Sequence, residues 1–178
     1  MRAHQSAVRG FSLIEVLVAL LIVAVGLLGV AKMQSAAIGN TKVASSRSIA
    51  SIFAASQAAA MMANKAYWAA GLLSAPGTVS VAGTALTETT LNSLTNACTV
   101  SACTPTELAA FDLKSWGTSL QAQLPSGTGA IACSTTVGVP ITCSITVSWA
   151  EKYIGINGAT SNTAQQTSNQ SLALLVEP

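Results

Sequence analysis

The stretch that decides the fold lies near the N-terminus, where residues 10–31 read GFSLIEVLVALLIVAVGLLGVA. From Phe11 to Ala31 this run contains a single charged residue, Glu15. A helix of that length spans about 30 Å, the thickness of a bilayer core. A secretory signal peptide has a shorter apolar region, of about 7–15 residues, followed by a small-residue cleavage site. The run is too long for that interpretation, and we expect a membrane-spanning helix.

A short basic leader precedes the apolar run. It contains Arg2 and Arg9 but no acidic residue, it ends at Gly10, and Glu15 is the fifth residue after that glycine. This arrangement resembles the type IV prepilin signature. The resemblance implies that a membrane-embedded prepilin peptidase cuts between Gly10 and Phe11 and then N-methylates Phe11. A glycine suits such a cut, because a residue without Cβ lets a protease approach the backbone closely.

Glu15 allows two interpretations. A carboxylate at the centre of a membrane helix costs about 2.5–3.5 kcal/mol or more, so it usually has a partner or a function. One interpretation is an interfacial residue that the N-terminal end of the helix dipole stabilises slightly. The resemblance to prepilins implies the other, in which Glu15 serves assembly by pairing with the N-terminal ammonium of a neighbouring subunit.

The helix is expected to continue well beyond the apolar run. No proline occurs before Pro76, and residues 32–65 are rich in Ala, Ser and Gln. We predict one helix from about Ser12 to Asn64, which is ~80 Å long at helical rise. Its second half would pack on a globular head through a moderate stripe at helical spacing, formed by Ile49, Ile52, Phe53, Ser56 and Ala60.

A second helix is predicted from a capping box. Thr104 suits the N-cap position, Pro105 the first helical position, and Glu107 completes the box. The helix should end before Pro125. One apolar face follows at helical spacing, formed by Ala109, Leu113, Trp116, Leu120 and Leu124.

The remaining patterns favour strands. Cys143, Ile145, Val147 and Trp149 alternate with polar residues, a period of two. A hairpin centred on Gly138 would place Cys133 opposite Cys143 and Ile131 opposite Ile145, with Val137 on the same face. Further short strands are expected at residues 78–81 and 172–176, the latter after a polar stretch from Gly158 to Gln170.

The four cysteines allow three disulfide pairings. The hairpin register favours Cys133–Cys143, which leaves Cys98–Cys103. A metal site is a weaker interpretation of these spacings, and the sequence predicts no metal and no cofactor. Two disulfides would place the head in an oxidising compartment, the periplasm or the exterior.

Composition narrows the function classes. Only 8% of the residues are charged, 51% are hydrophobic and the formal net charge is +2. Nothing in this charge pattern favours nucleic-acid binding. The one histidine, His4, lies in the leader, which disfavours Ser-His-Asp or Cys-His catalysis and most zinc chemistry. The acids Glu107, Asp112 and Glu151 are interpreted as helix-cap and surface charges, so no catalytic residue is predicted.

Later motifs resemble the PilV-type (pilus-modification) minor pilins. They are Met61-Met62-Ala63-Asn64, Cys103-Thr104-Pro105, Leu108-Ala109, Asp112-Leu113, Trp116, Leu120, Leu124-Pro125, Gly127, Gly129 and Val147-x-Trp149. The chain departs from that group in the second half of the long helix, which often carries more charge and an Arg after the methionine. The resemblance therefore does not predict the surface contacts of the head.

Together these features predict an α+β fold of the type IV pilin kind, a long N-terminal helix packed on an antiparallel, disulfide-bonded sheet. Its parts would be a removed leader (1–10), a transmembrane or fibre-core helix (11–31), an amphipathic continuation (32–65) and a periplasmic or extracellular head (66–178).

The resemblance implies a minor pilin that is incorporated into a type IV pilus or primes its assembly, with roles in biogenesis, adhesion or twitching motility. Its partners would be the prepilin peptidase, other major and minor pilins, the inner-membrane assembly machinery and the lipid bilayer. The precursor would be a single-pass inner-membrane protein with a periplasmic head, and the mature subunit would lie in the fibre at the cell surface. A type II secretion pseudopilin is the nearest rival, and a membrane-anchored periplasmic enzyme is a distant one.

Overall fold

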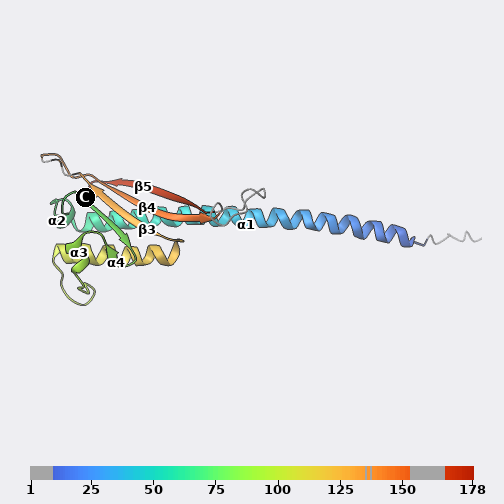
Figure 1. The fold of residues 1–178 in the computed structure, drawn as a ribbon, viewed down its shortest axis with the longest axis horizontal. Coiled ribbons are helices and arrows are strands. Elements are labelled where there is room, and N and C mark those ends of the chain that lie inside the picture. Colours follow the sequence, from blue (N-terminus) through green and yellow to red (C-terminus); the bar gives the residue numbers. More distant parts are fainter. Residues whose placement is uncertain (1–9, 135, 137, 153–166) are drawn as a thin grey trace, which may run out of the picture. The chain divides into compact units, whose positions relative to one another are not determined.

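The computed structural model describes residues 10–134, 136, 138–152 and 167–178 of the 178-residue chain. Its residues form two compact units, one ending at Thr41 and the other beginning at Lys42. Helix α1 (Leu13–Ala63) contributes to both units, while every other described element belongs to the second (Figure 1). The leader residues 1–9, Val137 and the polar residues 158–166 lie outside the described part.

Helix α1 has the boundaries that the sequence predicts to within one residue at each end. At its start, the Ser12 carbonyl accepts hydrogen bonds from the backbone N–H groups of Glu15 and Val16, at 3.0 and 3.3 Å. At its end, the Asn64 side chain donates to the Pro105 carbonyl at 2.8 Å. Asn64 is buried, so this bond ties the end of α1 to the start of α4 (Pro105–Gln123).

The stripe predicted for the second half of α1 is wrong in part. Ile49 and Phe53 are partly buried, but Ile52 is 62% exposed and Ser56 is exposed. The side chains that are buried most completely lie one position further along, at Ala50, Ala54, Gln57 and Met61. Two of these four residues are alanines and one is a glutamine, so hydrophobic size alone points to the wrong residues.

The head contains a five-stranded antiparallel sheet in the order β2-β1-β3-β4-β5. Its strands are β1 (Thr78–Ala82), β2 (Ala85–Leu86), β3 (Thr128–Cys133), β4 (Cys143–Lys152) and β5 (Thr167–Val176). Cys133 pairs with Cys143 and Ile131 with Ile145, so the predicted hairpin register is confirmed.

Strand β5 begins five residues before the predicted strand. Thr167 to Ser171 pair with the second half of β4, from Lys152 back to Ser148. The sequence TSNQS has no apolar residue because β5 is an edge strand whose alternate side chains are exposed. The part of the predicted polar stretch from residue 167 to 170 is therefore strand.

Helix α4 starts as predicted. Thr104 is the N-cap, and its side chain accepts a hydrogen bond from the Glu107 N–H. The Glu107 carboxylate in turn accepts from the Thr104 backbone N–H, so the capping box is confirmed. The predicted face is buried at Ala109, Leu113, Trp116, Leu120 and Leu124. Two short helices, α2 (Lys65–Trp68) and α3 (Thr89–Ser93), were not predicted from the sequence.

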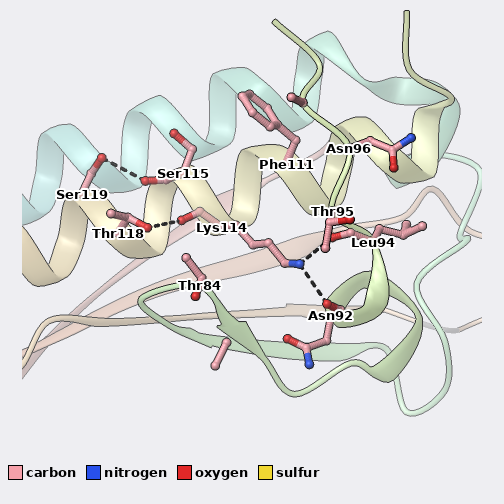
Figure 2. A pocket seen from close by; sticks show the side chains of 12 residues that line it. Thr84, Asn92, Leu94, Thr95, Asn96, Phe111, Lys114, Ser115, Thr118 and Ser119 are labelled. Atoms are coloured by element: carbon pink, nitrogen blue, oxygen red, sulfur yellow. Dashed lines mark hydrogen bonds between the residues drawn. The ribbon is translucent and has the colours of Figure 1, made fainter. Parts of the chain in front are cut away.

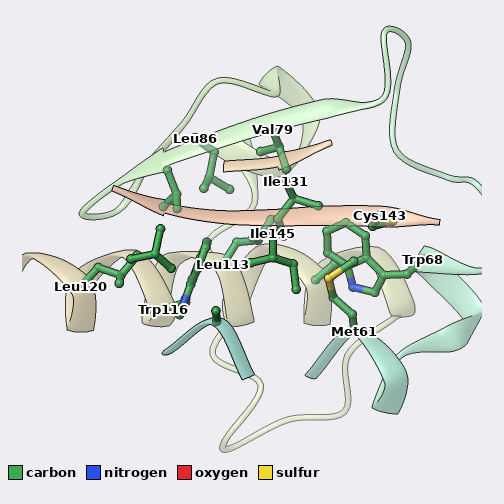
Figure 3. Packing of buried hydrophobic residues seen from close by; sticks show 14 of the residues in the cluster. Met61, Trp68, Val79, Leu86, Leu113, Trp116, Leu120, Ile131, Cys143 and Ile145 are labelled. Carbon is green, nitrogen blue, oxygen red and sulfur yellow. The ribbon is translucent and has the colours of Figure 1, made fainter. Parts of the chain in front are cut away.

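The core of the head lies between the sheet and the helices. Alternate residues of β4 point into it, since Cys143, Ile145, Val147 and Trp149 are each at most 3% exposed. Helix α4 contributes Leu113, Trp116 and Leu120 to the same cluster, and α1 contributes Met61 (Figure 3). Trp116 also donates a hydrogen bond from Nε1 to the Phe53 carbonyl of α1 at 3.1 Å, as expected of a core anchor. The predicted α+β architecture is thus confirmed.

Candidate functional site

The N-terminal motif surrounds the first turn of α1. Gly10, Phe11 and Ser12 precede the helix and have no regular secondary structure. Phe11 is 84% exposed, and no atom of the described residues lies within 4 Å of a Cβ built on Gly10. The described residues of this unit therefore leave the Gly10–Phe11 peptide bond open to an approaching enzyme, as cleavage at this point would require.

Glu15 lies in the first turn of α1, and its side chain is exposed. Within the described part of the chain, its carboxylate forms no hydrogen bond and no ion pair. The N-terminal end of the helix dipole favours a negative charge at this position. Glu15 thus offers an available carboxylate on a helix whose other nearby side chains are apolar.

The helix after this motif is long and apolar enough to cross a membrane. Its most apolar 18-residue window has a mean hydropathy of 2.9, and none of that window is buried. Large apolar side chains are exposed from Leu13 to Met33. Such a surface needs lipid or other apolar helices around it, because water solvates it poorly.

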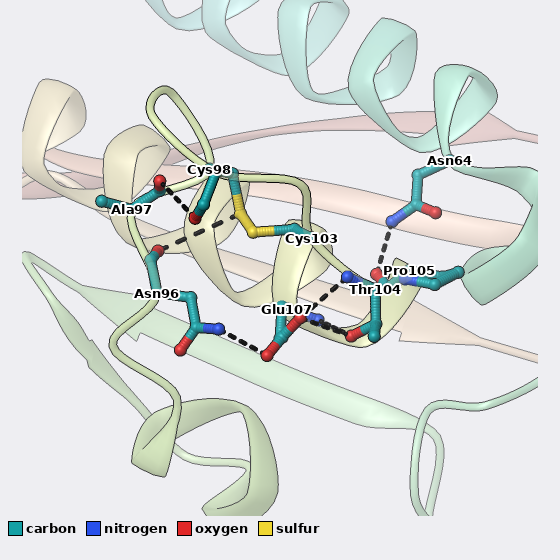
Figure 4. Close-up of a disulfide and its surroundings, with 9 residues drawn as sticks. Asn64, Asn96, Ala97, Cys98, Cys103, Thr104, Pro105 and Glu107 are labelled. Carbon is teal, nitrogen blue, oxygen red and sulfur yellow. Dashed lines mark hydrogen bonds between the residues drawn. A yellow bond between two sulfur atoms is a disulfide. The ribbon is translucent and has the colours of Figure 1, made fainter.

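The structure pairs the four cysteines as the sequence predicts. Cys98 and Cys103 have Cα atoms 5.6 Å apart, and Cys133 and Cys143 have Cα atoms 4.0 Å apart, with both sulfur pairs at bonding distance. The first pair closes a loop directly before α4, where Glu107 accepts hydrogen bonds from Thr104 and Asn96 (Figure 4). The second pair joins β3 to β4 in the core.

The acids singled out from the sequence have three different surroundings. Glu107 caps α4 as expected, and its pKa is lowered by hydrogen bonds from the Thr104 backbone and hydroxyl. Glu151 is not a surface charge: it is 9% exposed and accepts from Trp149 Nε1 at 3.1 Å and from Arg47 of α1 at 3.2 and 3.3 Å. Asp112 is half-buried, and burial raises its pKa. The structure does not bring these three carboxylates together into one site.

A shallow hollow of about 760 Å³ lies beside α4, among side chains that are mostly hydroxyls and amides. Figure 2 shows the Lys114 side chain reaching across it from α4. Its ammonium donates to the backbone carbonyls of Asn92, at 2.8 Å, and Leu94. Lys114 therefore holds the wall of this hollow in place. No cluster of His, Cys, Asp or Glu that could hold a metal occurs among the described residues.

Glu88 is a structural carboxylate that the sequence did not reveal. It is 8% exposed, caps α3 through the Leu91 N–H at 2.6 Å, and accepts from the Ser74 hydroxyl at 3.0 Å. Burial raises its pKa, but the hydrogen bonds from Leu91, Ser74 and Thr90 outweigh burial, so the net pKa is below its ordinary value of 4.5. Burial raises the pKa of Tyr67 to about 12, and the negative charge of Glu88 contributes to this shift.

This lowered pKa predicts acid sensitivity of the head. Glu88 binds a proton more tightly in the unfolded chain than in the folded one, so its ionised form stabilises the fold. Its contribution to the free energy of unfolding is complete above pH 4.5 and is lost as the pH falls through the lower folded-state pKa. We expect Glu88→Gln to lower the free energy of unfolding by about 1 kcal/mol at pH 7, because the amide keeps only one of the two oxygens that accept from Ser74 and Leu91. Urea unfolding at pH 7 and pH 3 should show the difference between wild type and variant shrinking in acid, and a constant difference would contradict this assignment.

Comparison with known proteins identifies the N-terminal motif. Residues 5–31 match a family model described as the prokaryotic N-terminal methylation motif. No curated protein and no solved structure matches the chain. The chain therefore carries the N-methylation motif of prokaryotic prepilin-type proteins, the family of type IV pilins and pseudopilins.

Several consequences follow from that motif. It implies processing by a prepilin peptidase and association with other pilins. It indicates a structural subunit rather than an enzyme. With the apolar part of α1, it is consistent with a pilin anchored in the inner membrane. The five-stranded sheet, the long apolar helix and the two cysteine pairs are consistent with a type IV pilin-like α+β fold.

Proposed function

We propose that this chain is a minor pilin, a structural subunit that enters a type IV pilus or primes its assembly. The observation that carries the proposal is the methylation motif at residues 5–31, whose Gly10–Phe11 bond precedes α1 and is exposed. A long apolar helix joined to a disulfide-containing α+β head supports the same role, because a fibre subunit needs an apolar segment for its core and a stable head for its surface.

In this proposal the precursor loses residues 1–10 and its new N-terminal Phe11 is methylated. Residues 11–31 anchor it in the inner membrane and later enter the fibre core, while residues 32–65 continue the helix and residues 66–178 form the periplasmic head. Glu15 pairs with the N-terminal ammonium of a neighbouring subunit during assembly. An ion pair is favoured there because a lone charge among apolar helices is costly.

The finer assignment is to the PilV-type minor pilins. It rests on the resemblance of the α4 region and of the β4 motif Val147-x-Trp149, and two of those residues have clear structural roles. Trp116 anchors α4 to α1, and Trp149 donates to the buried Glu151. A pilus with this subunit would differ in biogenesis, adhesion or twitching motility from one without it.

A type II secretion pseudopilin is the alternative, because pseudopilins share the methylation motif. The two functions differ in the assembly that contains the mature chain. Recovery of the chain with sheared surface pili supports the minor pilin, while recovery with the secretion machinery, and absence from pili, supports the pseudopilin.

Mass spectrometry of the mature N-terminus tests the processing step. We expect a chain that starts at Phe11 and carries one additional methyl group. Gly10→Val should leave the full-length precursor in the membrane, because a branched side chain blocks the close approach that glycine permits. An unprocessed wild-type chain, or cleavage at another bond, would refute the proposal.

A further inference from the structure

The two edges of the sheet in the head differ in how they are protected. One edge is β2, which is only two residues long. Its Leu86 N–H donates to the side chain of Asn92 in α3 at 2.9 Å, and next to β2 the Ser80 N–H donates to Thr87 Oγ1 at 2.8 Å. Native proteins keep an edge from pairing with another chain by making it short or by covering its backbone groups. The β2 edge is therefore closed.

The opposite edge, β5, is not protected in this way. It is ten residues long and pairs with β4 one residue to one, without a bulge. Residues 167–176 include no charged residue and no proline. Figure 1 shows β5 as the outermost strand, and β4 is its one neighbour in the described sheet. Such a strand is a ready template for pairing with another chain.

The hydrogen bonds of the sheet show which backbone groups of β5 point away from it. The Ser134 N–H donates to the carbonyl of Thr142, directly before β4, at 2.8 Å, so even-numbered residues of β4 direct their backbone groups toward β3. The direction alternates along an antiparallel strand, so odd-numbered residues of β4 face β5, where their partners are even-numbered. The odd-numbered residues of β5 therefore point their N–H and C=O groups outward, away from β4. These residues are Thr167, Asn169, Ser171, Ala173 and Leu175.

The side chains of β5 determine which kind of strand fits this edge. On the inner face, Leu172 and Leu174 are only partly buried at the rim of the core. On the outer face, Leu175 is 74% exposed. Apolar side chains on a neighbouring strand would cover these leucines, whereas a charged side chain would find no opposite charge within residues 167–176. The edge therefore fits an extended, uncharged segment with apolar residues beside the second half of β5.

We propose that β5 pairs with a strand of another pilin, so that the sheet continues across a subunit boundary. In such strand addition the main-chain hydrogen bonds supply affinity and the alternating side chains supply specificity. The inference rests on the proposed function, because it needs a neighbouring subunit.

The neighbour is a different pilin and not a second copy of this chain. Identical subunits of a filament meet through heterologous interfaces, which join two different surfaces of the subunit. A second copy would therefore have to offer a surface other than β5, and its other sheet edge is the closed β2 edge.

Two variants of Ala173 test this pairing in the native host. Ala173→Pro removes an outward N–H that β4 does not use, and proline is tolerated on edge strands in that orientation. Ala173→Lys places a charge on the exposed outer face of the edge, which is a natural device against edge pairing. We would measure the amount of each variant in sheared fibres relative to its amount in the membrane. The melting temperature of each purified full-length chain in detergent micelles reports on the fold.

Both variants should incorporate about tenfold less than wild type, which is typical of a lost hydrogen bond whose partner is left unpaired. Their melting temperatures should match that of wild type, and Ala173→Lys decides the test if proline lowers its own. Ala82→Lys is the matched control, because it makes the same change at an exposed position of β1, beside the opposite edge. Ala173→Ser keeps the N–H and the small size. Both controls should incorporate like wild type.

Photo-crosslinking identifies the partner. A benzoylphenylalanine at position 171, whose side chain is exposed on the outer face of β5, should crosslink in fibres to an extended, uncharged segment of another pilin. The same group at position 82 should give no such product.

The outcomes separate this inference from the proposed function. Absence of the wild-type chain from fibres would refute the proposed function itself. With wild type present, normal incorporation of both Ala173→Pro and Ala173→Lys would overturn the inference. An equal loss in Ala82→Lys would assign the contact to the outer face as a whole and overturn it too. Crosslinks from position 171 to a second copy of this chain would exclude a different pilin as the partner.

Discussion

Glu15→Ala should leave cleavage and methylation of the precursor unchanged but remove the chain from fibres. Glu15 lies one turn into α1, after the Gly10–Phe11 bond, so the bond that is cut keeps its surroundings. In the assembled fibre, the proposed partner of Glu15 is the N-terminal ammonium of a neighbour. Breaking a buried ion pair by removing one partner costs about 3–5 kcal/mol, so incorporation should fall by about 100-fold or more.

The measurement is the ratio of mature chain in sheared fibres to mature chain in the membrane. Glu177→Ala is a matched control, because Glu177 is an exposed acid outside α1, and it should incorporate like wild type. Glu15→Gln keeps the size and polarity without the charge and should lie between the two. Normal amounts of Glu15→Ala in fibres would mean that Glu15 is an interfacial residue with no assembly role.

The N-terminal motif, which the methylation-motif model matches, could be recognised from the sequence because its parts are contiguous. Leader, glycine and glutamate lie within residues 1–15, and no tertiary contact is needed to bring them together. The β3–β4 register was predictable for a similar reason. The period of two along β4 fixes which face is buried, and a hairpin then determines that Cys133 is opposite Cys143.

Features that depend on distant segments could not be predicted. Glu151 is separated from Arg47 by 104 residues, and nothing near Glu151 in the sequence indicates that it accepts from Arg47 and Trp149 in a buried position. The buried face of α1 could not be predicted because small and polar residues, Ala54 and Gln57 among them, are buried there, while the larger Ile52 is 62% exposed.

The second large effect concerns the contact between Trp116 and Gly129. The Trp116 ring occupies the position that a Cβ on Gly129 would take. Gly129 cannot move away, because it pairs with Val81 of β1 on one side and Val147 of β4 on the other. The ring is also held, since its Nε1 donates to the Phe53 carbonyl. Glycine is therefore needed at this position for close approach and not for backbone conformation.

Trp116→Ala should lower the free energy of unfolding of the head by about 3–5 kcal/mol. This is a large share of the whole free energy of unfolding of a typical domain, about 5–15 kcal/mol. Gly129→Ala alone should cost about 1–3 kcal/mol by overpacking. In the Trp116→Ala background, most of the Gly129→Ala cost should disappear, because the clashing ring is gone. A remainder is expected from the Val81 methyl group, which lies 2.9 Å from the position of the added Cβ.

Urea unfolding of the four chains in this double-mutant cycle measures the coupling directly. Leu120→Ala supplies the control background. Leu120 is fully buried on the same face of α4, but none of its atoms is among those nearest to a Cβ on Gly129. There Gly129→Ala should keep its full cost. Strict additivity in the Trp116→Ala background would show that the ring does not set the need for glycine, and β3 would then require Gly129 for its pairing with β1 and β4.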